Sequence, residues 1–228
     1  MAFALFPGET RSSLYQLTQS TFIKIGSEWN ISTSPTQTEV SEIVGEISFW
    51  DFQDILVLGF SSSYSEKNNG ILVFAREIVE AIVKSGKQDC LYLTLHEDFI
   101  WQYKLFADGN RTAYFSKYAG YFDEVEESPG DPEKVAELFS VPVSRLAGYH
   151  LRVISNENYE KVLLNKSTGY SGGDSNHTQP DQGFDFATAL GANVGETPPT
   201  EKWIVGTGKN KGSGGRIKGQ EPKNDLGK

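Results

Sequence analysis

The chain of 228 residues contains one cysteine, Cys90, and three histidines. A single cysteine excludes an internal disulfide and cannot form a metal site built from several thiolates. Cys90 opens an apolar segment with no cation beside it, so we interpret it as a small buried side chain rather than a reactive thiol. No His-Glu-x-x-His motif occurs, and we predict neither a metal ion nor a cofactor.

Other motifs that indicate catalysis or membrane insertion are also missing. No Walker phosphate-binding motif is present. No segment approaches the roughly 20 apolar residues of a membrane span, and the N-terminal segment lacks the basic region of a signal peptide. We therefore expect a cytoplasmic protein, and a role without catalysis is favoured.

Charge is unevenly distributed along the chain. The net charge is −9, but residues 206–228 carry six basic and two acidic side chains, +4, which leaves −13 on the rest. A body this acidic repels phosphate backbones, so nucleic acid is excluded as a main partner, apart from weak contacts by the basic tail. A basic protein partner is the complementary expectation, while the oligomeric state stays open.

The most regular pattern lies in residues 90–118. Seven apolar side chains stand at odd positions between residues 91 and 105, with Glu97 as the exception, and Asp108-Gly109 is typical of a two-residue hairpin turn. This pattern predicts an antiparallel β-meander. Residues 71–84 show apolar positions at helical spacing, closed by Gly86, and predict an amphipathic helix. We expect this helix to cover the odd-numbered face of the meander.

The predicted fold class is therefore α+β. We expect an antiparallel, or mixed, sheet of roughly four to six strands with a central meander, one long amphipathic helix, short additional helices and a disordered C-terminal tail. The chain divides into an N-terminal segment packed on the core (residues 1–48), an α+β core (49–165), a loop-rich extension with a short helix (166–205) and a flexible, basic, glycine-rich tail (206–228).

Several shorter elements are also predicted. Residues 14–17 and 22–25 suggest a strand and the start of a helix, residues 31–39 a loop and residues 54–60 a buried strand. Asp131-Pro132 is typical of a helix start, and the helix it opens extends to Phe139. Residues 168–182 are expected to form a loop, residues 184–190 a helix closed by Gly191, and residues 203–205 the last apolar run.

Acidic residues follow an aromatic run after the meander, and together they form our first candidate site. Tyrosine is a preferred anchor of protein interfaces, and carboxylates complement a basic partner. The size, acidity and single cysteine are similar to those of small bacterial immunity or accessory proteins that act by binding a partner. The leading hypothesis is a protein-binding module, of inhibitor or immunity type, that uses Tyr118, Tyr121, Asp123, Glu124, Glu126 and Glu127.

The alternatives come from other classes. A histidine-carboxylate pair can act as a general base, so a hydrolase or small-molecule-binding protein centred on His96, Asp98 and Trp101 is the main rival. A virion or assembly component is a further possibility. Residues 131–149 resemble a helix-turn-helix of the DNA-reading type, but the recognition segment, residues 143–151, holds Arg145 as its single base-contacting cation, where phosphate anchoring normally needs several.

Overall fold

The computed structural model describes residues 1–9, 11–29, 31–34, 40–62, 70–96, 100–116, 128–146, 149 and 179–208. Its strands form one sheet, in the order β2-β9-β3-β4-β1-β5-β6-β7-β8, and every pair of neighbours is antiparallel. The predicted α+β class is confirmed, but the described part of the sheet has nine strands rather than four to six. The strands are β1 (Ala2–Pro7), β2 (Ile31–Ser34), β3 (Val40–Phe52), β4 (Ile55–Ser62), β5 (Cys90–His96), β6 (Ile100–Ala107), β7 (Asn110–Ser116), β8 (Ser128–Pro129) and β9 (Glu201–Gly208).

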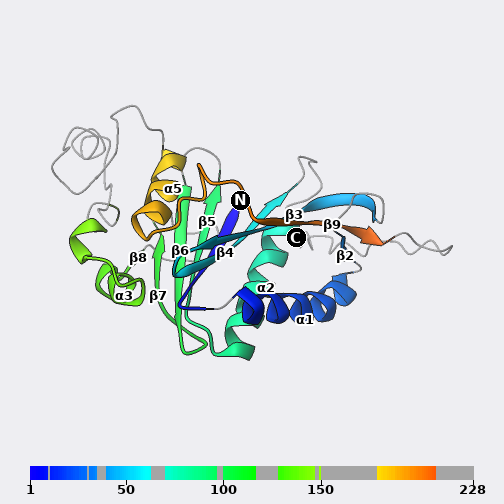
Figure 1. Ribbon diagram of the computed structural model, residues 1–228, viewed down its shortest axis with the longest axis horizontal. Helices are drawn as coiled ribbons and strands as arrows, with labels where there is room; N and C mark the ends of the chain where they lie inside the picture. The colour runs from blue at the N-terminus through cyan, green and yellow to red at the C-terminus, as the bar shows by residue number, and fades with distance from the viewer. Residues whose placement is uncertain are drawn as a thin grey trace, which may run out of the picture.

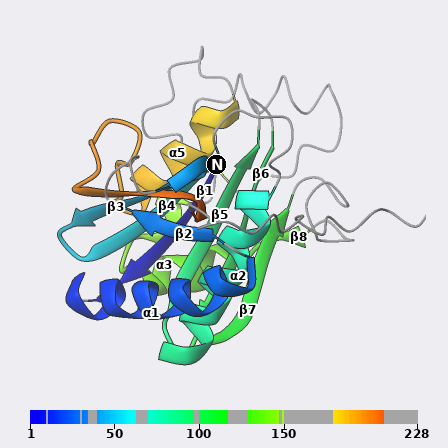
Figure 2. The same cartoon turned by 90° about the vertical axis from the view of Figure 1, so that its right-hand side faces the viewer.

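The first half of the chain forms a compact β-α-β-β-α-β unit. Its elements are β1, α1 (Arg11–Trp29), β3, β4, α2 (Gly70–Gly86) and β5, with the short β2 inserted before β3. In space the strands follow the order β3-β4-β1-β5, which is the arrangement of ferredoxin-like folds. Figures 1 and 2 show α1 and α2 side by side across this unit. So many unrelated functions use such a fold that it does not identify one.

The strand β1 occupies the centre of the sheet, between β4 and β5. Its residues from Ala2 to Phe6 are at most 2% exposed, because both faces of the sheet are covered at this point. A strand buried on both faces has a continuous apolar sequence. It therefore lacks the alternation of apolar and polar residues that indicates a half-buried strand.

The predicted β-meander is confirmed as β5-β6-β7. Asp108 and Gly109 form the two-residue turn between β6 and β7, with φ angles of 50° and 78°. Positive φ at both central positions is what a type I′ hairpin turn requires. A Cβ at Gly109 would lie 3.2 Å from the Val83 carbonyl oxygen, so the hairpin also approaches the end of α2 closely.

The two faces of the sheet carry separate cores. On the first face, α1 and α2 pack on the small or aromatic side chains of β1 and β5, Ala4, Cys90 and Tyr92 among them. On the second face lie the odd-numbered side chains of the meander, including Leu91, Leu93 and Tyr103. The expectation that α2 covers the odd-numbered face is therefore wrong: α2 covers the even-numbered face. Small side chains such as Ala2 and Ala4 leave room there for a helix to approach.

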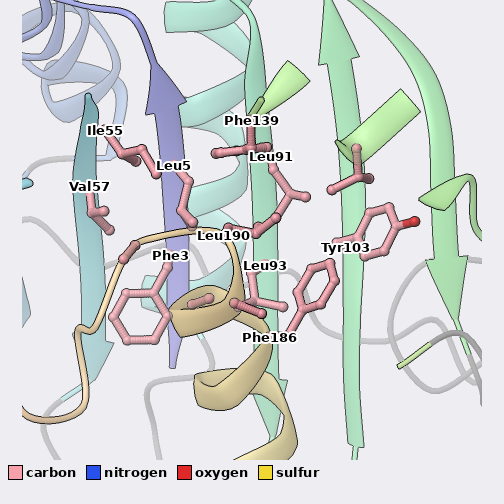
Figure 3. Close-up of a cluster of buried hydrophobic side chains, with 14 of the residues drawn as sticks. Phe3, Leu5, Ile55, Val57, Leu91, Leu93, Tyr103, Phe139, Phe186 and Leu190 are labelled. Atoms are coloured by element: carbon pink, nitrogen blue, oxygen red, sulfur yellow. The ribbon is translucent and has the colours of Figure 1, made fainter. Parts of the chain in front are cut away.

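Helices from the second half of the chain cover the second face (Figure 3). They are α3 (Pro132–Leu138) and α5 (Gln179–Ala189). Phe186 of α5 stacks on Tyr103, with ring centroids 5.6 Å apart. At Gly183 a Cβ would lie 2.1 Å from Leu95 Cδ2, so this glycine lets α5 settle directly on β5.

The segment 11–29 is one continuous helix, which corrects the prediction of a strand at 14–17. Leu14, Thr18, Phe22 and Ile25 are buried at helical spacing. Thr18 interrupts the apolar pattern, but its hydroxyl donates to the Leu14 carbonyl within the helix, at 2.8 Å. A polar side chain whose hydrogen bond is made within its own helix weakens the amphipathic pattern of the sequence, but it does not end the helix.

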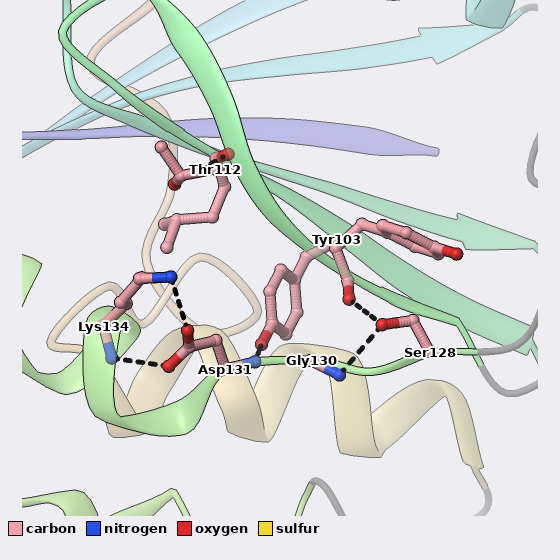
Figure 4. Close-up of polar contacts among 8 residues, drawn as sticks. Tyr103, Thr112, Ser128, Gly130, Asp131 and Lys134 are labelled. Atoms are coloured by element: carbon pink, nitrogen blue, oxygen red, sulfur yellow. Dashed lines mark hydrogen bonds and ion pairs between the residues drawn. The ribbon is translucent and has the colours of Figure 1, made fainter.

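The helix α3 begins as its sequence predicts. The Asp131 carboxylate accepts from the Lys134 backbone N–H at 3.0 Å, and Pro132 occupies the first turn. The Tyr103 hydroxyl accepts from the Asp131 backbone N–H at 3.0 Å and so ties α3 to β6 (Figure 4). After α3 comes a single turn of 3₁₀ helix, η2 (Val143–Arg145), where a DNA-reading motif would need a recognition helix.

The ends of three predicted segments also differ from the structure. Residues 31–34 form β2 rather than loop, and α5 begins at Gln179, within the predicted loop. Residues 206–208, assigned to the flexible tail, belong to β9, because each of them pairs with a residue of β2 or β3. The rest of the predicted tail, residues 209–228, lies outside the described residues. No helix in the described ranges is long and apolar enough to cross a membrane.

Candidate functional site

A cavity of about 290 Å³ opens on the second face of the sheet, and we call it the α5 cavity. Strands β1, β3, β4 and β9 form its floor, while Phe184 of α5 and the segment 194–199 form its walls. Ligand pockets usually enclose roughly 300–1,000 Å³, so this cavity has room for one small molecule. Its lining residues are Met1, Phe3, Glu46, Ser48, Trp50, Gly59, Phe60, Ser61, Phe184, Val194, Gly195, Pro199 and Lys202.

Three aromatic rings define the apolar part of the cavity. Phe3 makes edge-to-face contacts with Trp50 and Phe184, at centroid distances of 5.9 and 5.7 Å. Gly59 allows this arrangement, since a Cβ there would lie 2.5 Å from Trp50 Cζ3. Trp50 Nε1 donates to the Thr197 carbonyl at 2.7 Å and holds the wall segment against the sheet. The cavity wall is thus fixed before any ligand enters.

The polar part of the cavity comes from β3, β4 and β9. Lys202 Nζ lies 3.4 Å from Glu46 Oε2, and the two side chains are 52% and 37% exposed. Ser48 and Ser61 stand on the same face: Ser61 of β4 pairs with Glu46, which lies two residues before Ser48 on β3, and Ser48 itself pairs with Lys202 of β9. Ser48 is buried, and no hydrogen bond of either serine hydroxyl joins it to the described residues. These hydroxyls are therefore available to a ligand.

The amino group of Met1 completes one end of the cavity lining. It donates to the Leu95 carbonyl at 2.9 Å, and burial lowers its pKa below the ordinary value. Loss of water around an ammonium group disfavours its charged form. This amine is already engaged with β5, so we do not assign it to a ligand.

The lining of the α5 cavity combines aromatic rings, two serine hydroxyls and one ion pair. It contains no histidine and no cysteine, and the Glu46 carboxylate pairs with the Lys202 ammonium. Nucleophilic catalysis needs an activated group with a base in hydrogen-bond reach. Across the part of the chain that the structure describes, no group of three or more metal-ligating side chains is found either.

A second set of polar side chains lies on the first face. Thr94, Gln102 and Ser116 form a transverse row across the meander, and Lys104 stands in the next row, all of them buried. Gln102 Oε1 has no hydrogen-bond partner among the described residues. Gln102 and Lys104 therefore do not lie on an exposed face.

The predicted catalytic candidates are only partly described. His96 ends β5 and pairs with Ile100, while Asp98 and the side chain of His96 lie outside the described residues. Trp101 is 1% exposed and packs on Phe115 and Phe186, at centroid distances of 4.6 and 5.1 Å. The Trp101 ring thus belongs to the core of the second face. Catalysis at His96 and Asp98 stays a prediction.

The predicted partner-binding surface lies wholly in residues 117–127, outside the described residues, so Tyr118, Tyr121, Asp123, Glu124, Glu126 and Glu127 stay predictions. Cys90, by contrast, is confirmed as a buried side chain. It is 0% exposed, and burial raises the pKa of its thiol well above the ordinary value.

Comparisons with protein-family models, curated proteins and solved structures found no match to this chain. Function therefore has to be argued from the site itself. Sequence reasoning missed this site, because Glu46, Ser48 and Lys202 come together only through the pairing of β3 with β9. The one indication of the site in the sequence was Trp50, since a Trp close to Phe49 and Phe52 predicts aromatic packing.

Proposed function

We propose that this protein binds one small, mostly apolar molecule in the α5 cavity and does not transform it chemically. The observation that supports this most is the combination of three converging rings with four polar side chains at one small cavity. Pockets of this kind, largely apolar with a few placed polar groups, are the usual binding sites of small ligands.

Ligand-detected NMR with a set of small aromatic fragments tests this function. In Ser48→Leu a larger side chain occupies part of the cavity floor, so we expect the NMR signals of fragment binding to disappear in this variant. Ser20→Leu is the matched control, because Ser20 is exposed on α1 and bonds only within that helix. Fragments that bind Ser48→Leu as well as the unaltered protein, or no binding at all, would contradict the proposal.

A second candidate function follows from the charge of the chain. The net charge of −9, with a surplus of basic residues at the C-terminal end, favours a basic protein partner that meets the acidic stretch 123–127. Reversal of Glu124, Glu126 and Glu127 to Lys should weaken capture of a basic protein and reduce its salt dependence. Reversal of Glu80, Glu133 and Glu137, which are exposed on α2 and α3, is the control. Equal effects of the two triple variants would exclude a specific acidic surface.

A further inference from the structure

The charged side chains at the mouth of the α5 cavity limit which charges its ligand can carry. Glu46 projects from β3 and Lys202 from β9, on the same face and at the same edge of the aromatic walls. Among the described residues each is the other's only ion-pair partner, at 3.4 Å. An exposed ion pair of this kind contributes little to the stability of the fold. A ligand that offers one positive and one negative group can therefore separate the two side chains at little cost in free energy.

A ligand with a single charge would satisfy one of these side chains and leave the other without its partner. An anion would approach Lys202 but meet the repulsion of Glu46, and a cation would meet the reverse. A molecule that carries an ammonium group and a carboxylate on the same carbon atom satisfies both. Its ammonium would donate to Glu46, and its carboxylate would accept from Lys202.

The rest of the cavity selects the body of the ligand. Phe3, Trp50 and Phe184 contact one another edge to face, and an additional ring extends such a cluster with favourable geometry. The volume of about 290 Å³ admits one ring system with a short polar end rather than a longer chain. Ser48 lies between the ring walls and the charged pair, where its hydroxyl can bond to either polar group.

We infer that the ligand is an aromatic zwitterion of the α-amino acid type, with its ring among Phe3, Trp50 and Phe184 and its two charges on Glu46 and Lys202. This inference rests on the proposed function, because it names the ligand class of the same cavity. It goes further in predicting that both charges and the ring are needed together.

Calorimetry with four related probes tests the inference: L-phenylalanine, 3-phenylpropionate, which lacks the ammonium, phenethylamine, which lacks the carboxylate, and benzyl alcohol, which lacks both. We expect phenylalanine to bind about tenfold more tightly than either singly charged probe, the gain of one charge-assisted hydrogen bond. Glu46→Gln should weaken the binding of phenylalanine and phenethylamine and strengthen that of 3-phenylpropionate, because the repulsion of the anion is removed. Lys202→Met should weaken the binding of phenylalanine and 3-phenylpropionate and strengthen that of phenethylamine, because the repulsion of the cation is removed.

The outcomes separate the ligand class from the function. Benzyl alcohol that binds as tightly as phenylalanine, with neither charge variant altering the affinity, would overturn the zwitterion and leave a cavity that binds neutral molecules. The zwitterion is also overturned, and the binding function kept, if none of the four probes binds while other fragments bind the unaltered protein but not Ser48→Leu. Absence of any fragment binding would overturn the proposed function and the ligand class together. Because Glu46 and Lys202 are partly exposed, both variants should keep the melting temperature of the unaltered protein.

Discussion

The two faces of the sheet are closed in different ways. On the first face, two long helices that directly follow β1 and β4 pack against each other and on the strands. On the second face, the cover consists of α3, α5 and the segment 190–200, which come from the second half of the chain. The α5 cavity lies on this second face. There α5 contacts β5 and β6, while the segment 194–199 lies over β3, β4 and β9. The face closed by several short pieces thus provides the space for a ligand, whereas a pocket beside Leu14 and Tyr15 of α1 encloses only about 10 Å³.

Truncation of one buried phenylalanine on each face would show how independent the two cores are. Phe74→Ala on α2 and Phe186→Ala on α5 each remove a fully buried ring, and each should lower the free energy of unfolding by about 3–5 kcal/mol. We expect Phe186→Ala to expose the amides of α5 to hydrogen exchange before those of α1, and Phe74→Ala to do the opposite. Urea unfolding and amide exchange measure both effects. Equal loss of protection on both faces in each variant would show instead that the two cores unfold as one unit.

The phenol groups allow a milder comparison of the two faces. Tyr103→Phe removes the acceptor for the Asp131 N–H on the second face, and Tyr15→Phe removes a bond from α1 to Glu201, which is only partly buried. We expect a loss of about 1 kcal/mol for Tyr103→Phe, because the Asp131 N–H loses its acceptor, and less for Tyr15→Phe, because the Glu201 carboxylate still accepts from Trp203 Nε1. Urea unfolding at neutral pH measures the difference.

The same variants should differ at alkaline pH. Burial raises the pKa of Tyr103, and burial together with the charge of Asp185 raises that of Tyr149 to about 12. In the unfolded chain tyrosine loses its proton near pH 10, while the folded chain retains it. The free energy of unfolding should therefore fall as the pH rises above about 10. Tyr103→Phe should show a shallower fall, and an unchanged slope would contradict the assignment of this titration to Tyr103.

Sequence patterns predicted the elements whose local chemistry decides their structure. The helix α2 has a wide apolar stripe and a terminal glycine, and the meander has alternation and an Asp-Gly turn, so each is specified within its own segment. The start of α3 at Asp131-Pro132 is of the same kind. Where the necessary information lay within about twenty residues, the sequence was sufficient.

The remaining features depend on contacts between distant segments. Alternation in β5 shows that its two faces differ, but it cannot show which helix covers which face, because Cys90 and Tyr92 on the other face are also apolar enough to be buried. The site was missed for the same reason. The register of β9 on β3 places Lys202 beside Ser48, and neither segment alone carries a sign of that pairing.

The pairing of β9 with β3 also has a consequence for the order in which the protein can form. Strand β3 is made early, but the neighbour that covers its outer side, β9, comes from residues 201–208. Until that segment leaves the ribosome, β3 presents a long row of unpaired backbone groups, which is the kind of edge that other chains can join. Contacts across so long a stretch of sequence also slow folding. We therefore expect the nascent chain to be most prone to aggregation in the interval between the synthesis of β3 and that of β9.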